Sequence, residues 1–440
     1  MRWLLPLLLG FTVASCGLCG GDGNEDGNGN GLSGPNGTDR RTVVEFWHSM
    51  SSLNQVALQR IVDEFNESHS DYRVEPIYQG GYGDSLTKLI NSLGSGDIPT
   101  LFQADDVSTQ ILIDSEEMTP VQQFIDDEDY DLSDYDPKAL AYYTVNDTLY
   151  SMPFNPAGPI LIYDREAFRE AGLDPDRPPQ TLDDVRAYSE QLVRRDAQGN
   201  VTRYGISLQI SPWLFEQMLA KSGGPYVDHE NGRAGRAVEA AFDSEAGLEI
   251  IRWWDEMVES GLGYNAGRED RDALLKFAGG EATMVMGSSA VLAGGAALLT
   301  LLGGNTDQYG TAPLPAPAGD GGIVLGGGSL WVVSRASEGE REGAWEFIKF
   351  ASSAEQQAQW HVDTGYLPVR LSAYDLPVAV QRREQFPQFT TAVEQLRVSP
   401  DTPAARGALL GPFNEVRDRI RVAFELVLTA GADPAEELES

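Results

Sequence analysis

Residues 152–175 read MPFNPAGPILIYDREAFREAGLDP, and this stretch decides the fold. Two prolines and a glycine within residues 155–159 predict a rigid, non-helical turn. The apolar run 160–163 that follows is typical of a short buried strand. Asp164 is a candidate N-cap for the next helix, which Gly172 is expected to end. Two interpretations stay open: the strand carries the chain from one lobe to another beside a crevice, or it belongs to one continuous sheet.

The length, composition and charge of the chain describe an acidic globular protein. Its 440 residues predict about two to three lobes. Hydrophobic residues make up 41% of the chain and charged residues 22%, with a formal net charge of −35. Such a surface repels nucleic acid and anionic lipid headgroups, so we expect no nucleic-acid partner. An anionic ligand would need a local arginine or a set of backbone N–H groups to overcome this field.

Cysteines and histidines offer the folded body no metal site. Cys16 and Cys19 both lie near the N-terminus, and the four histidines are scattered without metal-ligand spacing. The acidic run 126–136 lacks the spacing and the glycine of an EF-hand loop, which favours a solvated surface. We therefore expect neither a metal nor a cofactor.

The N-terminus resembles the signal of a bacterial lipoprotein. The apolar run 3–13 follows a positive start and is too short to span a bilayer. It ends in Val-Ala-Ser-Cys16, which resembles the motif whose cysteine is lipidated after cleavage; a plain secretory signal is the alternative. We expect a signal peptide over 1–15, then a lipidated Cys16 and a flexible Gly/Asn/Asp linker over 16–41. A lipid anchor alone would tether the protein outside the membrane.

Strand and helix patterns alternate from residue 42 onward. Residues 42–47, 72–78 and 100–104 are expected strands separated by amphipathic helices. This alternation predicts a parallel α/β sheet, in which ligands bind at the carboxyl ends of the strands. Tyr82 and Asp106 fall at such ends, as does the turn before residue 159.

The helix-rich second half of the chain supplies further candidate ligand contacts. The triple glycine 326–328 precedes a buried strand and is expected to let the backbone approach a ligand or a neighbouring segment closely. The other candidates are a tryptophan in a loop, a serine at a strand end, a tyrosine in a tight turn and an arginine on an amphipathic helix: Trp213, Ser288, Tyr366 and Arg417. If Arg417 faces inward, it is the cation that an acidic protein needs to hold an anion.

Together, six motifs resemble the family 1 extracellular solute-binding proteins of ABC importers, and within that family the glycerol-3-phosphate-binding branch. The motifs span about residues 43–428 in order: Phe46 to Met50, Gly80 to Tyr82, Pro153 to Asn155, Ala171 to Pro175, Gly327 to Trp331 and Trp360 to Pro368. The resemblance implies an α/β fold, a two-lobed clamshell of the type II periplasmic-binding-protein kind with a helix-rich second lobe. It implies a first lobe over 42–152, a second mainly over 153–310, and a return to the first with C-terminal helices over 311–440.

Position by position, the resemblance implies that Tyr82, Ser288, Gly327, Tyr366 and Arg417 contact the ligand. Arg417, Ser288 and the tyrosines would hold phosphate, and Trp213 would stack on glycerol carbons. The chain departs from the family at three pocket positions, which are Asp106 for a glutamate, Ala157 for a phosphate-binding serine and Ile210 for a second tryptophan. One lost donor costs about 1 kcal/mol. A wider pocket with fewer donors suits a diester such as glycerophosphocholine, or a neutral oligosaccharide.

The function predicted from the sequence is capture of a glycerophosphate-type solute by an extracytoplasmic lipoprotein. The protein would deliver glycerol-3-phosphate or a glycerophosphodiester to ABC permease subunits, and we expect it to be a monomer. A neutral-sugar binder of the same fold is the alternative. A hydrolase using Asp105 and Asp106 is disfavoured because adjacent strand residues point to opposite faces, and Gly-x-Ser-x-Gly and His-Glu-x-x-His are absent.

Overall fold

The computed structural model describes residues 40–94, 96, 98–301 and 306–439. Residues 41–440 form one compact unit, to which the following description applies. The predicted signal peptide, Cys16 and nearly all of the predicted linker lie outside the described residues. Within the described part of the chain, no helix combines the length and apolar character needed to cross a bilayer.

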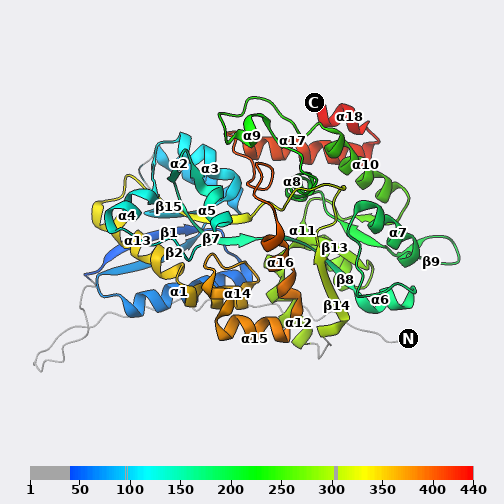
Figure 1. Cartoon of the computed structure of the whole chain (residues 1–440), viewed down its shortest axis with the longest axis horizontal. Coiled ribbons are helices and arrows are strands. Elements are labelled where there is room, and N and C mark those ends of the chain that lie inside the picture. Colours follow the sequence, from blue (N-terminus) through cyan, green and yellow to red (C-terminus); the bar gives the residue numbers. More distant parts are fainter. Residues whose placement is uncertain (1–39, 95, 97, 302–305, 440) are drawn as a thin grey trace, which may run out of the picture. The chain divides into compact units, whose positions relative to one another are not determined.

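The first sheet is mixed and has six strands. Its order is β2 (Tyr72–Tyr78), β1 (Thr42–His48), β3 (Leu101–Asp105), β15 (Gly326–Val333) and β4 (Met118–Thr119), with β7 (Met152–Ala157) also paired to β15. The prediction of parallel pairing is right for β1, β2 and β3 but wrong for β15, which runs antiparallel to β3 and β7. The late strand β15 therefore lies in the middle of a sheet begun by the N-terminal strands (Figure 1).

The second sheet is also mixed. Its order is β12 (Gly263–Asn265), β11 (Ile206–Leu208), β13 (Met284–Ser288), β8 (Pro159–Asp164) and β14 (Tyr309–Pro313). Strand β8 lies in its interior, antiparallel to both β13 and β14, which suits its apolar sequence. Short two-stranded ribbons pair β5 (Thr144–Val145) with β6 (Thr148–Leu149), and β9 (Arg194–Arg195) with β10 (Val201–Arg203).

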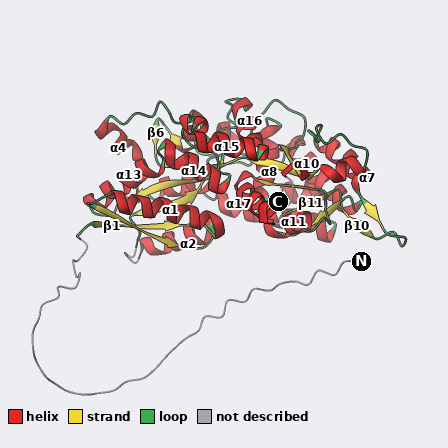
Figure 2. Ribbon diagram, turned by 90° about the horizontal axis from the view of Figure 1, so that it is seen from below, coloured by secondary structure: helices red, strands yellow, loops and turns green. Residues whose placement is uncertain are grey.

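Helices pack beside both sheets (Figures 1 and 2). Those that follow or contact strands of the first sheet are α1 (Ser52–Ser68), α2 (Tyr82–Leu93), α3 (Thr109–Asp114), α4 (Val121–Glu128), α5 (Pro137–Tyr143), α13 (Glu338–Ala351) and α14 (Ala354–Thr364). The remaining helices are α6 (Arg165–Glu170), α7 (Leu182–Leu192), α8 (Pro212–Lys221), α9 (Asp228–Gly232), α10 (Glu245–Glu259), α11 (Asp270–Ala278), α12 (Leu292–Leu301), α15 (Pro377–Gln385), α16 (Thr390–Val398), α17 (Phe413–Glu425) and α18 (Pro434–Glu439).

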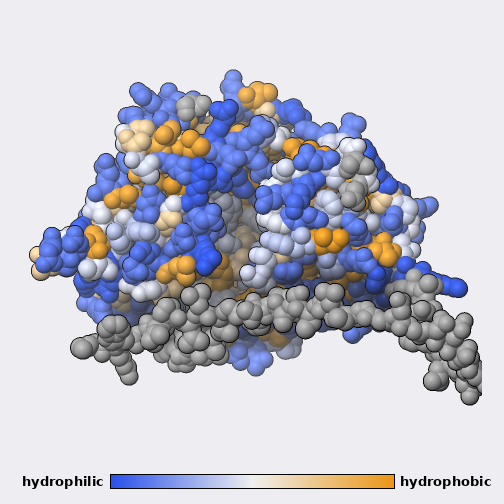
Figure 3. Space-filling model, turned by 180° about the vertical axis from the view of Figure 1, so that it is seen from behind, coloured by the Kyte–Doolittle hydropathy of each residue, from blue (hydrophilic) through white to orange (hydrophobic). Residues whose placement is uncertain are grey.

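Polar residues dominate the face of the molecule that Figure 3 shows, and apolar residues are scattered singly or in small groups. Beneath the surface, the two largest clusters of buried apolar side chains are separate. One surrounds β8, β11 and β13, and the other surrounds β1, β7 and β15. Each sheet therefore has its own core, as expected for a chain of this length.

Residues 152–164 connect the two sheets. Strand β7 belongs to the first sheet and β8 to the second, with only Gly158 between them, so the interpretation as one continuous sheet is wrong. The turn predicted within residues 155–159 is wrong for residues 155–157, because these residues are the end of β7. The prolines of β7 fit there since the strand pairs with β15 alone. Asp164 caps α6 as predicted, accepting from the backbone of Glu166 at 2.8 Å and of Ala167 at 3.0 Å.

The triple glycine allows β15 to lie against β7. Gly327 has φ +104°, and a Cβ there would come 2.0 Å from the carbonyl oxygen of Asn155. Because both the backbone conformation and the space exclude a side chain, this position requires glycine. Of the two uses expected for the glycines, close approach to a neighbouring segment is what the structure shows.

We expect Gly327→Ala to lower the free energy of unfolding by about 3 kcal/mol, because it combines left-handed strain with a backbone clash. Urea denaturation followed by tryptophan fluorescence measures this change. Gly287→Ala is the matched control, since nothing lies within 4 Å of the Cβ it would add and its φ lies outside the left-handed region. Equal stability of the two variants would contradict this account of β15.

Candidate ligand-binding site

Two tyrosines meet around Asn155 on β7. Tyr82 is the first residue of α2, and its hydroxyl accepts a hydrogen bond from Asn155 Nδ2 at 2.9 Å. Tyr366 follows α14, and its ring stacks on Trp360 with 5.7 Å between centroids. Burial raises the pKa of Tyr366 to about 12, although hydrogen bonds from Asn155 and Tyr82 partly oppose this rise. Both hydroxyls therefore stay protonated at neutral pH.

Arg417 on α17 faces inward, with a side chain only 15% exposed. Its Nε and Nη2 donate to the two carboxylate oxygens of Glu216 on α8, at 2.8 and 2.6 Å. Its Nη1 lies 4.0 Å from Asp105 Oδ2, and the guanidinium sits 5.3 Å above the ring of Phe413. The sequence analysis did not foresee Glu216 as the partner of this arginine.

Three carboxylates surround this one guanidinium, and we call Asp105, Asp106 and Glu216 the acidic cluster. Burial raises the pKa of Asp106 to about 8, although the positive charge of Arg417 acts to lower it. Burial also raises the pKa of Asp105, again against Arg417. One cation cannot balance three buried anions, so the acidic cluster binds at least one proton. Asp106 is the residue that binds it most readily.

Asp105 and Asp106 are not adjacent residues of one strand, contrary to the prediction from the sequence. Strand β3 ends at Asp105, and Asp106 begins a 3-10 turn that runs to Ser108. The alternation of strand side chains therefore does not apply to this pair. Both carboxyl groups instead lie within the field of Arg417.

A small cavity lies beside the acidic cluster and is bounded by Asp106, Glu216 and the aromatic rings of Tyr142, Tyr226 and Phe413. Outside the cavity, Arg233 covers Tyr142 at 4.9 Å. Its guanidinium donates to four backbone carbonyls, those of Ala141, Tyr142, Arg406 and Gly407. Burial lowers the pKa of Arg233 to about 10. This second buried cation therefore contacts both the ring and the backbone of Tyr142.

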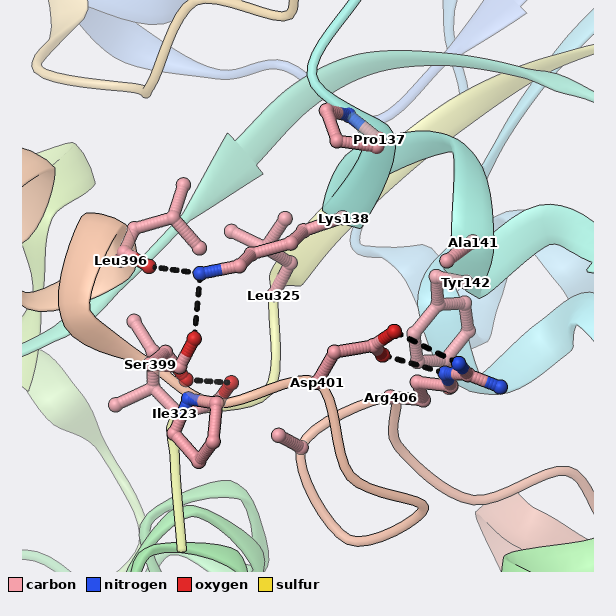
Figure 4. Close-up of a pocket in the computed structure, with 12 residues that line it drawn as sticks. Pro137, Lys138, Ala141, Tyr142, Ile323, Leu325, Leu396, Ser399, Asp401 and Arg406 are labelled. Atoms are coloured by element: carbon pink, nitrogen blue, oxygen red, sulfur yellow. Dashed lines mark hydrogen bonds and ion pairs between the residues drawn. The ribbon is translucent and has the colours of Figure 1, made fainter.

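Tyr142 also borders a second cavity of about 150 Å³ (Figure 4). There, Lys138 Nζ donates to the carbonyl oxygens of Leu396 at 2.5 Å and Ser399 at 2.6 Å. Asp401 and Arg406, which also line the cavity, form a two-bond ion pair at 2.6 and 2.8 Å. Lys138 thus ties α5 to the end of α16, and all three charges are paired or hydrogen-bonded within the protein.

The remaining predicted residues lie on strand ends and helix starts. Trp213 is partly exposed at the start of α8, and a Cβ on Gly326 would come 2.6 Å from its Nε1. Ser288 ends β13, and its hydroxyl accepts from the backbone of Ala290 at 3.2 Å. The hydroxyl of the next residue, Ser289, accepts from Gly158 N at 3.3 Å. The capping role therefore belongs to Ser288.

The start of β15 brings most of these residues together. Gly326 faces Ala157 in register, and Gly328 lies between Asp105 on β3 and Asn155 on β7. Tyr366 is drawn in because Leu367 N donates to Pro156 O at 2.8 Å. Ile210 does not join this group, since it is 3% exposed and packs in the core of the second sheet.

Glu216 was not among the predicted candidate residues, and Asn155 was predicted only as part of a turn at the ligand-binding end of the sheet. Glu216 could have been found, because it lies three residues after Trp213 and so shares a helix face with it. Asn155 was hidden by the prediction of a turn where β7 runs. No group of three or more metal-ligating side chains suited to a metal ion occurs among the described residues.

The chain is similar to known solute-binding proteins over most of its length. Residues 60–388 match a family described as Bacterial extracellular solute-binding protein. The sn-glycerol-3-phosphate-binding periplasmic protein of Yersinia enterocolitica is 31% identical over 408 residues, covering 91% of this chain and 90% of that protein. The corresponding protein of Escherichia coli K12 is 30% identical over 413 residues with the same coverage.

Solved structures agree at the level of the fold. The UgpB protein of Mycobacterium tuberculosis, in complex with glycerophosphocholine, superposes with a TM-score of 0.77 at 23% identity, covering 90% of this chain and 96% of that one. The acarbose-binding GacH receptor of Streptomyces glaucescens has a TM-score of 0.74 at 21% identity, with 90% and 95% coverage. Binders of different solutes thus share this arrangement.

The raised pKa of Asp106 predicts a pH-dependent stability difference between the wild type and Asp106→Asn. Folding takes up a proton between about pH 4 and 8, so the wild type loses stability relative to the variant as pH rises through that window. The slope is at most about 1.4 kcal/mol per pH unit for one proton. Urea denaturation at intervals of one pH unit measures it. Asp127→Asn, at an exposed position, is the control, and a flat difference for Asp106→Asn would refute this pKa.

Proposed function

Because this chain belongs to the bacterial extracellular solute-binding protein family, we propose that it captures a glycerophosphate-type solute, either glycerol-3-phosphate or a glycerophosphodiester. The family resemblance and the α/β fold of the periplasmic-binding-protein kind, both expected from the sequence, are confirmed. The protein is an extracellular or periplasmic solute-binding component of an ABC importer, and its role is transport rather than catalysis. Permease subunits are the partners that membership of this family implies.

The observation that carries the proposal is the inward-facing guanidinium of Arg417. Glu216 occupies one edge of the guanidinium, formed by Nε and Nη2. A guanidinium has five N–H donors, so its other edge can still pair with two oxygens of a phosphate. Glu216 thereby holds the plane of Arg417 in a fixed orientation, which reduces the ordering cost of ligand binding.

The charge balance of the site favours a diester over a monoester. Arg417 is already paired with Glu216, and Asp105 also lies beside it, so the site carries no excess of positive charge. A diester brings one negative charge, whereas a phosphate monoester brings up to two. The second charge would add repulsion from carboxylates that lie near the guanidinium. A glycerophosphodiester is therefore the better match.

Names of similar proteins point the same way. The relatives at 30% and 31% identity are named for sn-glycerol-3-phosphate, and one protein of the same fold was solved with glycerophosphocholine. Trp213, at the N-terminus of α8 and beside Gly326, would pack its ring against the carbon atoms of the glycerol. The small Ala157, opposite Gly326 in the register of β7 and β15, would leave room for a substituent on the phosphate.

A neutral sugar is the second candidate, and the pairing of Arg417 with Glu216 favours it. An arginine already neutralised by a carboxylate serves a sugar hydroxyl as well as a phosphate oxygen. The fold is also shared with the acarbose-binding receptor. The two candidates differ in how strongly binding depends on the positive charge.

We also propose that the two sheets are the centres of two lobes that close over the solute. The lobes would correspond broadly to residues 42–152 with 311–440, and to 153–310, except that β7 belongs to the first sheet, β14 to the second, and α17 and α18 pack in the core of the second sheet and would move with it. Gly158 and its neighbours in β7 would act as one hinge, because this link between the sheets is a single residue long. Ligand contacts from both lobes would favour the closed form.

Replacing Arg417 and Glu216 together separates the two candidate ligands. The double variant Arg417→Met/Glu216→Gln removes one charge of each sign, so neither partner is left buried and unpaired. We expect affinity for glycerophosphocholine and glycerol-3-phosphate to fall about 100-fold, because at least two charge-assisted hydrogen bonds are lost. Isothermal titration calorimetry with these two ligands and maltose measures the effect.

Glu216→Gln alone is the matched control and should keep or strengthen phosphate binding, since it frees positive charge. Unchanged affinity of the double variant for both glycerophosphates would contradict the role of Arg417. Binding of maltose but of neither glycerophosphate by the wild type would favour the sugar-binding alternative.

We further propose that Cys16 is lipidated and anchors the protein to the membrane. The full-length wild type, expressed in a bacterium, should incorporate labelled palmitate and remain with the membrane fraction. Cys16→Ser should lose the label and appear in the soluble fraction, whereas Cys19→Ser should behave like the wild type. Release of the wild type without label would indicate a plain secretory signal.

A further inference from the structure

A chain of buried amides links the end of β1 to the two tyrosines. Ser49 N donates to Gln103 Oε1 at 3.0 Å, and Gln103 Nε2 donates to Asn155 Oδ1 at 2.8 Å. Asn155 Nδ2 then donates to Tyr82 Oη at 2.9 Å. We call Ser49, Gln103 and Asn155 the amide relay.

The direction of every hydrogen bond in the relay is fixed at its first member. A backbone N–H can only donate, so the side-chain atom of Gln103 facing Ser49 must be the oxygen. The nitrogen of Gln103 then faces Asn155, which must present its own oxygen in turn. Asn155 is left with only its NH₂ group to offer Tyr82. The tyrosine oxygen must accept, so its proton points away from the relay.

The amide relay is buried, so water cannot take the place of any donor or acceptor in it. Gln103 and Asn155 are both 0% exposed, and Ser49 is 9% exposed. The backbone of Gly328 lies over the last link, since a Cβ there would come 3.0 Å from Asn155 Oδ1 and 3.0 Å from Tyr82 Oη. No side chain larger than that of glycine would leave this link intact.

We propose that Asn155 is a positioning residue that makes Tyr82 an obligatory hydrogen-bond donor toward the ligand. The donors of the relay all point from Ser49 toward the site, and the hydroxyl of Tyr82 continues this direction to the ligand. The ligand atoms at this end of the site must therefore be acceptors. Phosphate oxygens, which carry no proton in a diester, meet this requirement. This identification of the ligand atoms rests on the proposed function, whereas the direction of the relay does not.

Asn155→Asp tests the direction with almost no change of shape. One aspartate oxygen would still accept from Gln103, but the other can no longer donate to Tyr82. The tyrosine would turn its proton onto the aspartate and stop donating to the ligand. We expect affinity for glycerophosphocholine to fall at least tenfold.

A double-mutant cycle separates this reversal from simple charge repulsion. In the wild-type background, Tyr82→Phe should weaken glycerophosphocholine binding about tenfold, because a donor is lost. In the Asn155→Asp background, Tyr82→Phe should change affinity less than about twofold, because the hydroxyl has already turned away. An equal loss in both backgrounds would overturn the proposal, since repulsion by a new charge adds independently. If Asn155→Asp does not fold, Gln103→Glu reverses the relay one step earlier and takes its place in the cycle.

A ligand-free measurement keeps the relay testable if no glycerophosphate binds. In ¹⁵N-labelled wild type, the side-chain NH₂ groups of Gln103 and Asn155 should exchange slowly with solvent. Tyr82→Phe should shift the Asn155 signal and leave that of Gln103 in place. Fast exchange of either group would overturn the relay, whereas slow exchange without glycerophosphate binding would overturn the proposed ligand alone.

Discussion

The contact on which the rest of the structure depends is the approach of β15 to β7 at the glycines. Strand β15 can reach the end of β7 only because Gly327 presents no Cβ to the carbonyl of Asn155. This contact attaches the strand that leads into the second sheet to the middle of the first. It also fixes Asn155, and with it the two tyrosines. Fold and site are thus consequences of the same backbone contact.

The electrostatics of the site follow from placing one arginine among three buried carboxyl groups. A chain with a net charge of −35 gives an approaching anion no help at long range. Binding of an anion must come from short contacts inside the protein, where water no longer screens them. Glu216 lowers the net charge available to the ligand but holds Arg417 in place. The site thus attracts an anion less strongly but presents Arg417 in a fixed orientation. A fixed orientation contributes more to specificity than to affinity.

Much of the fold and part of the site could be predicted from the sequence. Alternating patterns located the strands, and Asp164 capped its helix as a local signal should. The prolines of β7 misled the analysis because they are common in turns; the strand tolerates them since it pairs on one side only. The spacing of Glu216 from Trp213 is a local signal for its place near the site, but its pairing with Arg417, some 200 residues away in sequence, leaves no such signal. Contacts of this kind depend on how distant segments pack together, which the local sequence of either segment does not show.

Gly328 lies between Asp105 and Asn155 and therefore separates two ends of the site that differ in chemistry. On the side of Asn155, the amide relay leaves the hydroxyl of Tyr82 as a donor. On the side of Asp105, Arg417 supplies further donors, and the acidic cluster around it supplies carboxyl oxygens, which are mostly acceptors. A solute that satisfies both must place oxygen acceptors within reach of Tyr82 and Arg417 and hydroxyl donors toward the carboxyl groups. A glycerophosphodiester carries both kinds of group, since its phosphate oxygens can only accept and its glycerol diol can donate. A sugar offers mixed hydroxyls all round and needs no such separation, so the division of the site itself argues for the phosphate-bearing solute.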